Sequence, residues 1–427
     1  MKDNLSLIFS ILVTVAGGLG LFLLGMKHLS EGLQATAGGG LRKFMTHATS
    51  HRLVGVGTGI FSTMLVQSSS IITVMLVGFV STALMTLPQA INVLIGANIG
   101  TTATVWIIAY APNPQALGFV GIALGGALYF FLRGERVHNL GLTVIGLGLV
   151  FLGLYFMSKG VAPIKQNPDF AHIFTTMSAQ HIGGVVKIAV AATLLTAVIQ
   201  SSAATIAIAM ALAQQGLITY DVAIAVLFGA NIGTTATGWI AAIGGTADAK
   251  RTALSHTLSN VAGSVVLVPF FYVFFVKVGP WLFPNYADPE TIVVSGQSVQ
   301  AYTHMMAPIA VTDTLFACAR GVLLFPFVKP FARLIEKMIK QPENEKPHLS
   351  CLKVGMLVSP VLACDQALQE VTFMRESNLE LLDCARKVLA DESDEALENH
   401  ITHREEILDT VQKEVTDFLG SMMSKRL

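Results

Sequence analysis

The sequence predicts an all-α membrane protein with inverted-topology repeats, two re-entrant helical hairpins and a C-terminal cytosolic helical domain. Three observations support this fold class. The 427 residues are 53% hydrophobic and 13% charged, whereas about a quarter of the residues of a soluble protein are charged. Apolar stretches of roughly twenty residues, the length that crosses a bilayer, recur along the chain. A pair of polar motifs also occurs twice at one spacing.

The repeated motifs are Gly-Ala-Asn-Ile-Gly-Thr-Thr, at residues 96–102 and 229–235, and Gln-Ser-Ser, which begins at Gln67 and at Gln200. The interval from Gln to Asn is identical in the two copies (98 − 67 and 231 − 200). The same order and spacing indicate an internal duplication. A duplicated polar motif inside an apolar chain is typical of secondary transporters, whose substrate sites lie at the interface between repeats.

Seven crossings and two hairpins account for the apolar segments. The first crossing, near residues 5–28, carries a glycine-rich block at residues 18–25 that matches residues 146–153, so we expect it to belong to the repeat and not to a cleaved signal peptide. Each Gln-Ser-Ser lies inside an apolar segment that forms either one crossing or two half-helices meeting at the polar break. These segments are residues 53–80 and 182–213, and the other crossings are expected near residues 88–110, 116–132, 139–157, 220–243, 255–279 and 305–327.

Loop charge predicts the orientation, because loops rich in Lys and Arg stay in the cytoplasm. The basic loops fall on one side only if both Gln-Ser-Ser segments are re-entrant hairpins. The chain then has about seven crossings, an outside N-terminus, and a second repeat inverted relative to the first. If each hairpin were a full crossing, the basic loops would no longer share a side. The basic loops are residues 41–52, 133–136 and 250–251 and the stretch after Lys329; loops 111–116, 214–220 and 280–303 carry no Lys or Arg.

The chain divides into four predicted regions. Residues 1–138 form the first membrane repeat, and residues 139–335 form the second repeat plus the final transmembrane helix. A linker at residues 336–360 leads to a helical tail at residues 361–427. Of the 27 Asp and Glu residues, 10 lie in residues 1–340 and 17 in residues 341–427. We therefore expect the tail to be soluble and cytoplasmic, and nothing in the composition indicates a nucleic-acid partner.

The polar motifs predict an anion site without a fixed positive charge. Their hydroxyl and amide groups, together with free N–H groups at half-helix N-termini, could surround a tetrahedral oxyanion such as phosphate. The candidate phosphate residues are Gln67, Ser68, Ser69, Ser70, Gln200, Ser201 and Ser202.

The same region offers oxygen atoms that suit sodium, with Gly96, Gly100, Gly229 and Gly233 expected to let the chain bend and expose carbonyl groups. The alternative is structural, since small residues are common at helix contacts in membranes. The duplication of a buried Gln argues against that alternative, because its amide needs partners. The candidate sodium ligands are Gln67, Ser68, Asn98, Thr101, Thr102, Gln200, Ser201, Thr205, Asn231, Thr234 and Thr235.

The late crossings add a few ionisable groups. Asp313 lies well inside a predicted crossing, and Arg320 follows it at a spacing near two helical turns (320 − 313). A structural ion pair and a functional role are equally open for this pair. For His256, Asn260 and His304 we expect hydrogen-bonded packing roles.

The two motifs in this order resemble the type II sodium-dependent phosphate cotransporters, in particular the bacterial members. Residues 146–154 and the run Ala-Leu-Ser-His-Thr-Leu-Ser-Asn at residues 253–260 are also similar to family patterns. The resemblance covers roughly residues 5–330. It implies coupled sodium and phosphate transport by inverted repeats in the cell (inner) membrane, with the two Gln-Ser-Ser segments forming the substrate and sodium region. Sodium would be the coupling ion, with no further cofactor.

The chain departs from the family pattern in three places, one of which is Ser259-Asn260 where the family often has Phe-Asn after His-Thr-x. The second motif reads Gln-Ser-Ser-Ala, so Ala203 replaces a third Ser. In the last crossing, Asp313-Thr-Leu-Phe-Ala stands where a second His-Thr-x-Phe-Asn is expected. The tail resembles a short PhoU domain of bacterial relatives; regulation, scaffolding and a homo-oligomer stay open for it.

Other functions predict other residues. An intramembrane serine hydrolase needs a His or Lys base, and neither motif segment contains one, so we expect no enzymatic activity. A channel, a transporter of another oxyanion, and a phosphate exporter remain alternatives. We expect phosphate, sodium and the lipid bilayer to be the partners.

Overall fold

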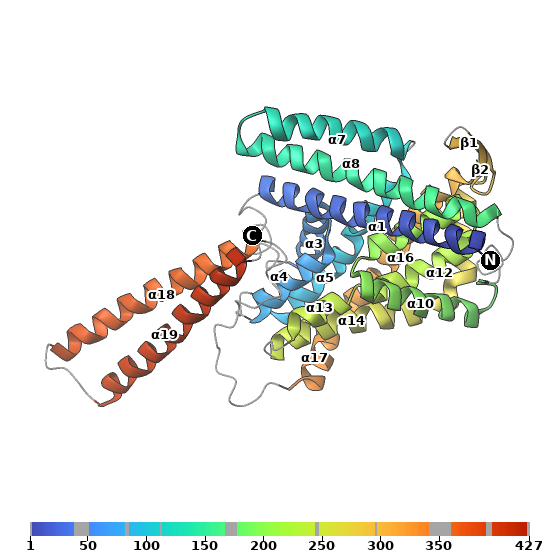
Figure 1. Ribbon diagram of the computed structural model, residues 1–427. Helices are drawn as coiled ribbons and strands as arrows, with labels where there is room; N and C mark the ends of the chain where they lie inside the picture. Colours follow the sequence, from blue (N-terminus) through green and yellow to red (C-terminus); the bar gives the residue numbers. More distant parts are fainter. Residues whose placement is uncertain are drawn as a thin grey trace.

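The computed structural model describes residues 2–37, 51–81, 85–111, 113–166, 177–243, 247–294, 297–340, 360–389 and 395–424. Helices dominate these residues (Figure 1). The first part contains α1 (Lys2–Ala37), α3 (Arg52–Val66), α4 (Ser69–Ser81), α5 (Leu87–Gly100), α6 (Thr102–Ala109) and α7 (Pro114–Phe131). The second contains α8 (Glu135–Val161), η2 (Ala162–Gln166), α10 (Ile182–Ile199), α11 (Ser202–Gln214), α12 (Tyr220–Gly233), α13 (Ala236–Ala242) and α14 (Ala247–Leu267).

The remaining elements lead to the last crossing and the tail. They are η3 (Val268–Phe270), the π-helix η4 (Phe271–Phe275), α15 (Val276–Leu282), β1 (Glu290–Val294), β2 (Gln297–Ala301), η5 (Thr303–Met305), α16 (Met306–Leu324), η6 (Phe325–Phe327), α17 (Val328–Met338), α18 (Pro360–Leu389) and α19 (Glu395–Ser424).

The duplication seen in the residues extends to the helices. The interval between the starts of α4 and α11 (202 − 69) equals the interval between the starts of α5 and α12 (220 − 87). The two repeated asparagines keep the same offset (231 − 98). The run α3 to α6 therefore has a structural copy in the run α10 to α13.

Eight helical segments of the described chain are long and apolar enough to cross a membrane. Seven of them overlap the expected crossings. The eighth, Ile182–Ile199, is the first arm of the second Gln-Ser-Ser segment, whereas its counterpart Arg52–Val66 has only 15 residues. The chain is thus a multi-pass membrane protein.

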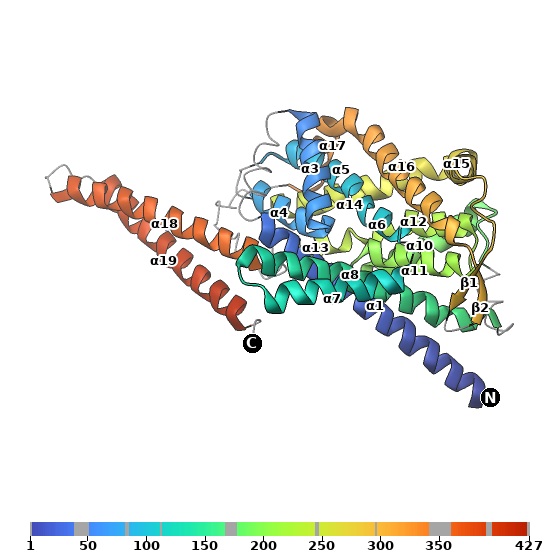
Figure 2. The same ribbon diagram turned by 90° about the horizontal axis from the view of Figure 1, so that it is seen from above.

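The matching glycine blocks pack against each other. Helices α1 and α8 lie side by side along a layer that also contains α7 (Figures 1 and 2). A Cβ added to Gly18 would lie 2.7 Å from the backbone nitrogen of Met157, and one added to Gly25 would lie 2.5 Å from that of Val150. These glycines permit backbones to approach closely, which is how helices associate in lipid.

The glycines of the second motif also allow helices to pack closely, which for Gly96 and Gly229 corrects the expectation that they bend the chain. A Cβ on Gly96 would overlap the backbone oxygen of Val56, and one on Gly229 would overlap that of Ala189. Gly100 and Gly233 lie against the same arms, α3 and α10. Helices α5 and α12 run unbroken through Gly96 and Gly229, where the missing side chain allows close packing, and they end at Gly100 and Gly233.

A two-stranded antiparallel sheet interrupts the all-α pattern. Strands β1 and β2 pair with Glu290 opposite Ala301, where the sequence predicts only a loop at residues 280–303. The β-branched run Thr-Ile-Val-Val in β1 favours a strand. His304 Nε2 lies 2.7 Å from Glu290 Oε1 of this sheet, and the His304 side chain is 52% exposed, so it has a polar partner but is not packed among the helices.

The tail forms a hairpin of two helices, and the helical structure expected from its sequence is confirmed. Helices α18 and α19 lie against each other and extend away from the membrane helices in both views (Figures 1 and 2). Leu408, Val411 and Val415 of α19 are buried, as is Ala367 of α18. Most of the predicted linker, residues 341–359, lies outside the described residues.

Candidate functional site

Each Gln-Ser-Ser segment is a genuine break between two helices. Gln67 ends α3 with φ 56°, and Gln200 ends α10 with φ 60°. They are the only residues other than Gly with a positive φ in the described chain. Their backbone N–H groups donate to Thr63 (2.7 Å) and Thr196 (2.6 Å), which closes the helix ends in the left-handed conformation that normally favours glycine.

The serine after each Gln starts the next helix. Ser68 Oγ accepts from the backbone N–H of Ile71 at 3.3 Å, and Ser201 Oγ accepts from that of Ala204 at 3.2 Å. Both serines are N-caps of thirteen-residue helices. Each break therefore presents a helix N-terminus with its partial positive charge, and each capping hydroxyl still has its own proton to donate.

The two breaks differ in their surroundings. Thr104 Oγ1 donates to Gln67 Oε1 at 2.8 Å, and Gln67 Nε2 donates to the backbone oxygen of Met64. Thr237 Oγ1 donates to Ser70 Oγ at 3.1 Å. At the second break Gln200 is exposed, and Ala203 stands where the first break has Ser70. The first break is thus more closely connected to its surroundings.

The candidate threonine ligands bond to their own helices. Thr101 and Thr234 donate to the backbone oxygens of Ala97 (2.9 Å) and Ala230 (3.0 Å). Thr102 and Thr235 donate in the same way to residues 99 and 232, both at 2.8 Å. Thr205 accepts from Thr196 at 2.8 Å and donates to Ser201. Their hydroxyl protons are used, so only their oxygen lone pairs are left for a cation.

The two repeated asparagines meet through a buried network. Asn98 Nδ2 donates to Asn260 Oδ1 at 3.1 Å, and Asn260 Nδ2 donates to the backbone oxygen of Asn231 at 3.1 Å. Asn98 Oδ1 lies 3.3 Å from His256 Nε2, and the other ring nitrogen lies 3.5 Å from Thr73 Oγ1 on α4. The network therefore connects the second motifs of both copies to the helix that follows the first break.

Arg320 and Asp313 complete this network without touching each other. Arg320 donates to Asn260 Oδ1 (2.6 Å) and Asn231 Oδ1 (2.8 Å), and Asn231 Nδ2 donates to Asp313 Oδ1 at 3.3 Å. The ion pairs within 4.0 Å among the described residues do not include this pair. The amide of Asn231 thus links the two charges, in place of the direct ion pair that the sequence left open. His256 and Asn260 are hydrogen-bonded and buried.

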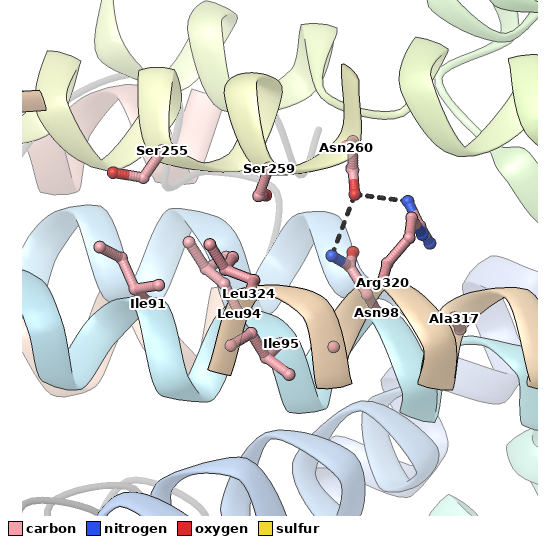
Figure 3. A pocket seen from close by; sticks show the side chains of 11 residues that line it. Ile91, Leu94, Ile95, Asn98, Ser255, Ser259, Asn260, Ala317, Arg320 and Leu324 are labelled. Carbon is pink, nitrogen blue, oxygen red and sulfur yellow. Dashed lines mark hydrogen bonds between the residues drawn. The ribbon is translucent and has the colours of Figure 1, made fainter. Parts of the chain in front are cut away.

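A small pocket opens beside this network (Figure 3). The side chains of Asn98 on α5, Asn260 on α14 and Arg320 on α16 converge at one end of it. Ser255 and Ser259 of α14 and aliphatic side chains such as Leu94 line the rest. The polar end is where a small ion or a water molecule would find partners.

The structure unites some of the predicted residues and not others. Asn98 and Asn231 belong to one network, and Ser70 reaches the second copy through Thr237. The described hydrogen bonds of the two Gln-Ser-Ser segments do not join one segment to the other. Thr104 and Thr237 were missed, although the repeat extends by Ala-Thr to make identical runs at 96–104 and 229–237. Asn260 and Arg320 lie outside this repeated run, so the repeat could not link them to the motifs.

The helices and the duplicated polar breaks define a multi-pass membrane protein whose polar centre is built from two copies of one helical unit. Residues 21–159 and 166–282 match the family model described as Na+/Pi-cotransporter. The chain therefore belongs to this phosphate transport family, as the resemblance predicted. Helix α16, with Asp313 and Arg320, lies beyond the matched residues.

Relatives support the family and differ in their names. The "Uncharacterized protein YqeW" of Bacillus subtilis (strain 168) is 30% identical over 324 residues, which cover 74% of this chain and 95% of the relative. The "Putative inorganic phosphate export protein YjbB" of Escherichia coli (strain K12) is 25% identical over 387 residues, covering 89% of this chain and 66% of the relative. The human "Sodium-dependent phosphate transport protein 2B" is 37% identical over 100 residues, covering 23% and 14%. No solved structure matches the chain.

Proposed function

We propose that this protein moves inorganic phosphate across the cell membrane together with sodium, by alternating access between two inverted repeats. The observation that carries the proposal is the pair of helix breaks at Gln67 and Gln200. Each break presents a helix N-terminus capped by a serine hydroxyl. Such ends bind anions without a fixed positive charge, and two of them could share the four oxygens of phosphate.

In this scheme Ser68, Ser69, Ser70, Ser201 and Ser202 bind the phosphate through hydroxyl and backbone N–H groups. Sodium binds to amide and hydroxyl oxygens in the same region and lowers the cost of placing an anion inside the membrane. Non-helical backbone at membrane depth is tolerated where it lines a wet cavity. The breaks are therefore re-entrant hairpins that enter from opposite sides, and the tail is cytoplasmic.

The contacts of the two copies with α14 and α16 support a two-fold relation between the copies. Trp106 Nε1 donates to Thr314 Oγ1 at 2.9 Å, and Trp239 Nε1 donates to Thr257 Oγ1 at 2.8 Å. The two tryptophans have the offset of the repeated asparagines (239 − 106 and 231 − 98). Asn98 with His256 and Asn231 with Asp313 repeat this exchange, because Asp313 follows His256 at the interval by which Thr314 follows Thr257. Each copy thus contacts both α14 and α16, with the two helices exchanged, as expected of two units related by a two-fold axis in the membrane.

The Ser68→Ala and Ser201→Ala variants test the phosphate assignment. We expect both to insert into the membrane and to take up labelled phosphate into proteoliposomes much more slowly than the wild type. Ser10→Ala, at an exposed position of α1, is the matched control and should transport normally. Full sodium-dependent uptake by both motif variants would remove these serines from the site.

Phosphate export is a second candidate. A relative covering 89% of this chain carries the name of a phosphate export protein. Direction follows the sodium and phosphate gradients, so export needs no different site. Net efflux from phosphate-loaded proteoliposomes under an outward sodium gradient, with no influx under the inward gradient, would favour an exporter.

A further inference from the structure

Arg320 is held at its two terminal nitrogens, while its buried Nε has no hydrogen-bond partner among the described residues. Its NH1 and NH2 groups bind the side-chain oxygens of Asn260 (2.6 Å) and Asn231 (2.8 Å). Its Cζ lies 4.6 Å from the centre of the Phe316 ring, a favourable cation–π distance. Arg320 is 5% exposed. Because an arginine stays protonated in proteins, the centre of the membrane region contains a permanent positive charge.

The facing helix leaves room for this side chain. A Cβ added to Gly263 on α14 would lie 2.9 Å from Arg320 Cγ and 3.1 Å from its Cδ. Any larger residue at position 263 would push the arginine stem away from Asn260. The glycine, the aromatic ring and the two amide oxygens together hold the guanidinium in one place.

The oxygens that Arg320 uses are those a sodium ion would use. Asn231 was predicted to be a sodium ligand, since sodium prefers oxygen ligands. Its side-chain oxygen instead accepts from Arg320 at 2.8 Å. A sodium ion placed beside Asn231 would also be repelled by the guanidinium, and like charges repel strongly where little water screens them. Asp313, linked through the same amide, balances the arginine.

Among the described residues of this network, a cation of this kind lies only beside Asn231 and not beside its repeat equivalent Asn98. Helices α14 and α16 correspond at a constant offset, which pairs His256 with Asp313 (313 − 256) and Gly263 with Arg320 (320 − 263). On the first-copy side, Asn98 Oδ1 faces His256 Nε2 at 3.3 Å, and the position equivalent to Arg320 is a glycine. The two asparagines of the repeat are therefore in different electrostatic surroundings.

We propose that Arg320 is a tethered cation that takes the place of one sodium ion at the Asn231 and Asn260 oxygens. Each phosphate then crosses with one sodium ion fewer than it would without this side chain. Sodium binds on the Asn98 side instead. The inference rests on the sodium coupling proposed above, and it assigns a stoichiometric role to a residue outside both sequence motifs.

The Arg320→Gln variant tests the inference through the ratio of labelled sodium flux to labelled phosphate flux in proteoliposomes. We expect the ratio to increase by one sodium per phosphate, with a steeper dependence of uptake on sodium concentration, because Asp313 and the vacated oxygens then attract an ion. Arg320→Lys keeps a positive charge and should retain the wild-type ratio. Arg251→Gln removes an arginine that binds Asp248 (2.7 Å) and the backbone oxygen of Ile339 (2.9 Å), and should leave the ratio unchanged.

An unchanged ratio in Arg320→Gln would overturn the inference. If that variant does not fold, Asn231→Ala and Asn98→Ala decide the question. We expect the sodium concentration for half-maximal uptake to increase in Asn98→Ala and to stay constant in Asn231→Ala; an equal increase in both would show that Asn231 binds sodium. Absence of sodium-dependent uptake by the wild type would instead contradict the proposed function, so the two failures are distinguishable.

Discussion

The side chain of Asn260 holds Asn98 and Asn231 together, although these two residues lie in different copies of the repeat. It accepts from the amide of Asn98 and donates to the backbone oxygen of Asn231, both at 3.1 Å. One residue of α14 thus contacts equivalent positions of both copies. A relative movement of the copies has to alter this contact.

Replacing Asn260 should therefore destabilise the protein strongly. The Asn260→Ala variant leaves the Asn98 amide, an Arg320 N–H and the Asn231 carbonyl without partners, and each buried unpaired group costs about 1–3 kcal/mol. Ser259→Ala is the neighbouring control, because Ser259 bonds only back to His256 at 2.9 Å in the described contacts. Melting temperatures in detergent check the prediction, and equal values for the two variants would contradict it.

The left-handed backbone at Gln67 and Gln200 predicts an unusual order of stability. A side chain at this conformation costs about 1–2 kcal/mol, which a glycine avoids, whereas a β-branched residue tolerates it least. Gln200 is exposed, so Gln200→Gly should unfold at or above the wild-type temperature, and Gln200→Val well below it. Loss of phosphate uptake in the stable Gln200→Gly variant would separate the function of the side chain from that of the backbone. A Val variant as stable as the wild type would refute the strain argument.

Close packing at the motif glycines makes them sensitive to one added methyl group. Gly96→Ala and Gly229→Ala place a Cβ into backbone oxygens of α3 and α10, and overpacking of this kind typically costs about 1–3 kcal/mol or more. Gly57→Ala adds the same group where nothing lies within 4 Å. The yield of monodisperse protein and its melting temperature should fall only for the first two variants. Similar behaviour of all three would mean that α5 and α12 are held less tightly.

The folded tail contains a buried carboxyl group that makes the tail more stable at low pH. Burial, and then the charge of Glu414, raise the pKa of Glu370 from 4.5 to about 7. The folded tail therefore binds a proton that the unfolded tail releases, so its stability falls as pH rises from 4.5 to about 7 and stays lower above it. The raised pKa corresponds to at most about 3 kcal/mol, an upper limit that screening by water reduces.

Glu370→Gln should remove this dependence. Hydrogen exchange of α18 in the full-length protein should be slower in the variant than in the wild type at pH 8, with a much smaller difference at pH 5. Glu376→Gln, at an exposed position of the same helix, is the control. Equal protection of wild type and Glu370→Gln at pH 8 would show that the charge on Glu370 does not lower the stability of the tail.

Local patterns predicted most of the membrane helices and both breaks. Gln-Ser-Ser is a polar interruption of an apolar run, and the capping preference of serine explains why α4 and α11 begin where they do. The roles of Gly96 and Gly229 were misread, because a glycine that packs and a glycine that bends look alike in one sequence. The β1–β2 sheet was missed, since its strands are short and lie in a segment that was interpreted only through its lack of Lys and Arg.

The centre of the network depends on long-range packing. Asn260 and Arg320 belong to helices far from the motifs in sequence, and only the fold brings them to Asn231. The spacing of Asp313 and Arg320 along one helix suggested an ion pair. The structure places the Asn231 amide between them, which no spacing on α16 could indicate.

Labelled phosphate uptake into proteoliposomes, with an inward sodium gradient and with potassium in its place, tests the central claim most directly. We expect uptake only with sodium, with competition by unlabelled phosphate and none by sulfate. Equal uptake in sodium and potassium, by protein shown to be folded and correctly inserted, would contradict sodium coupling.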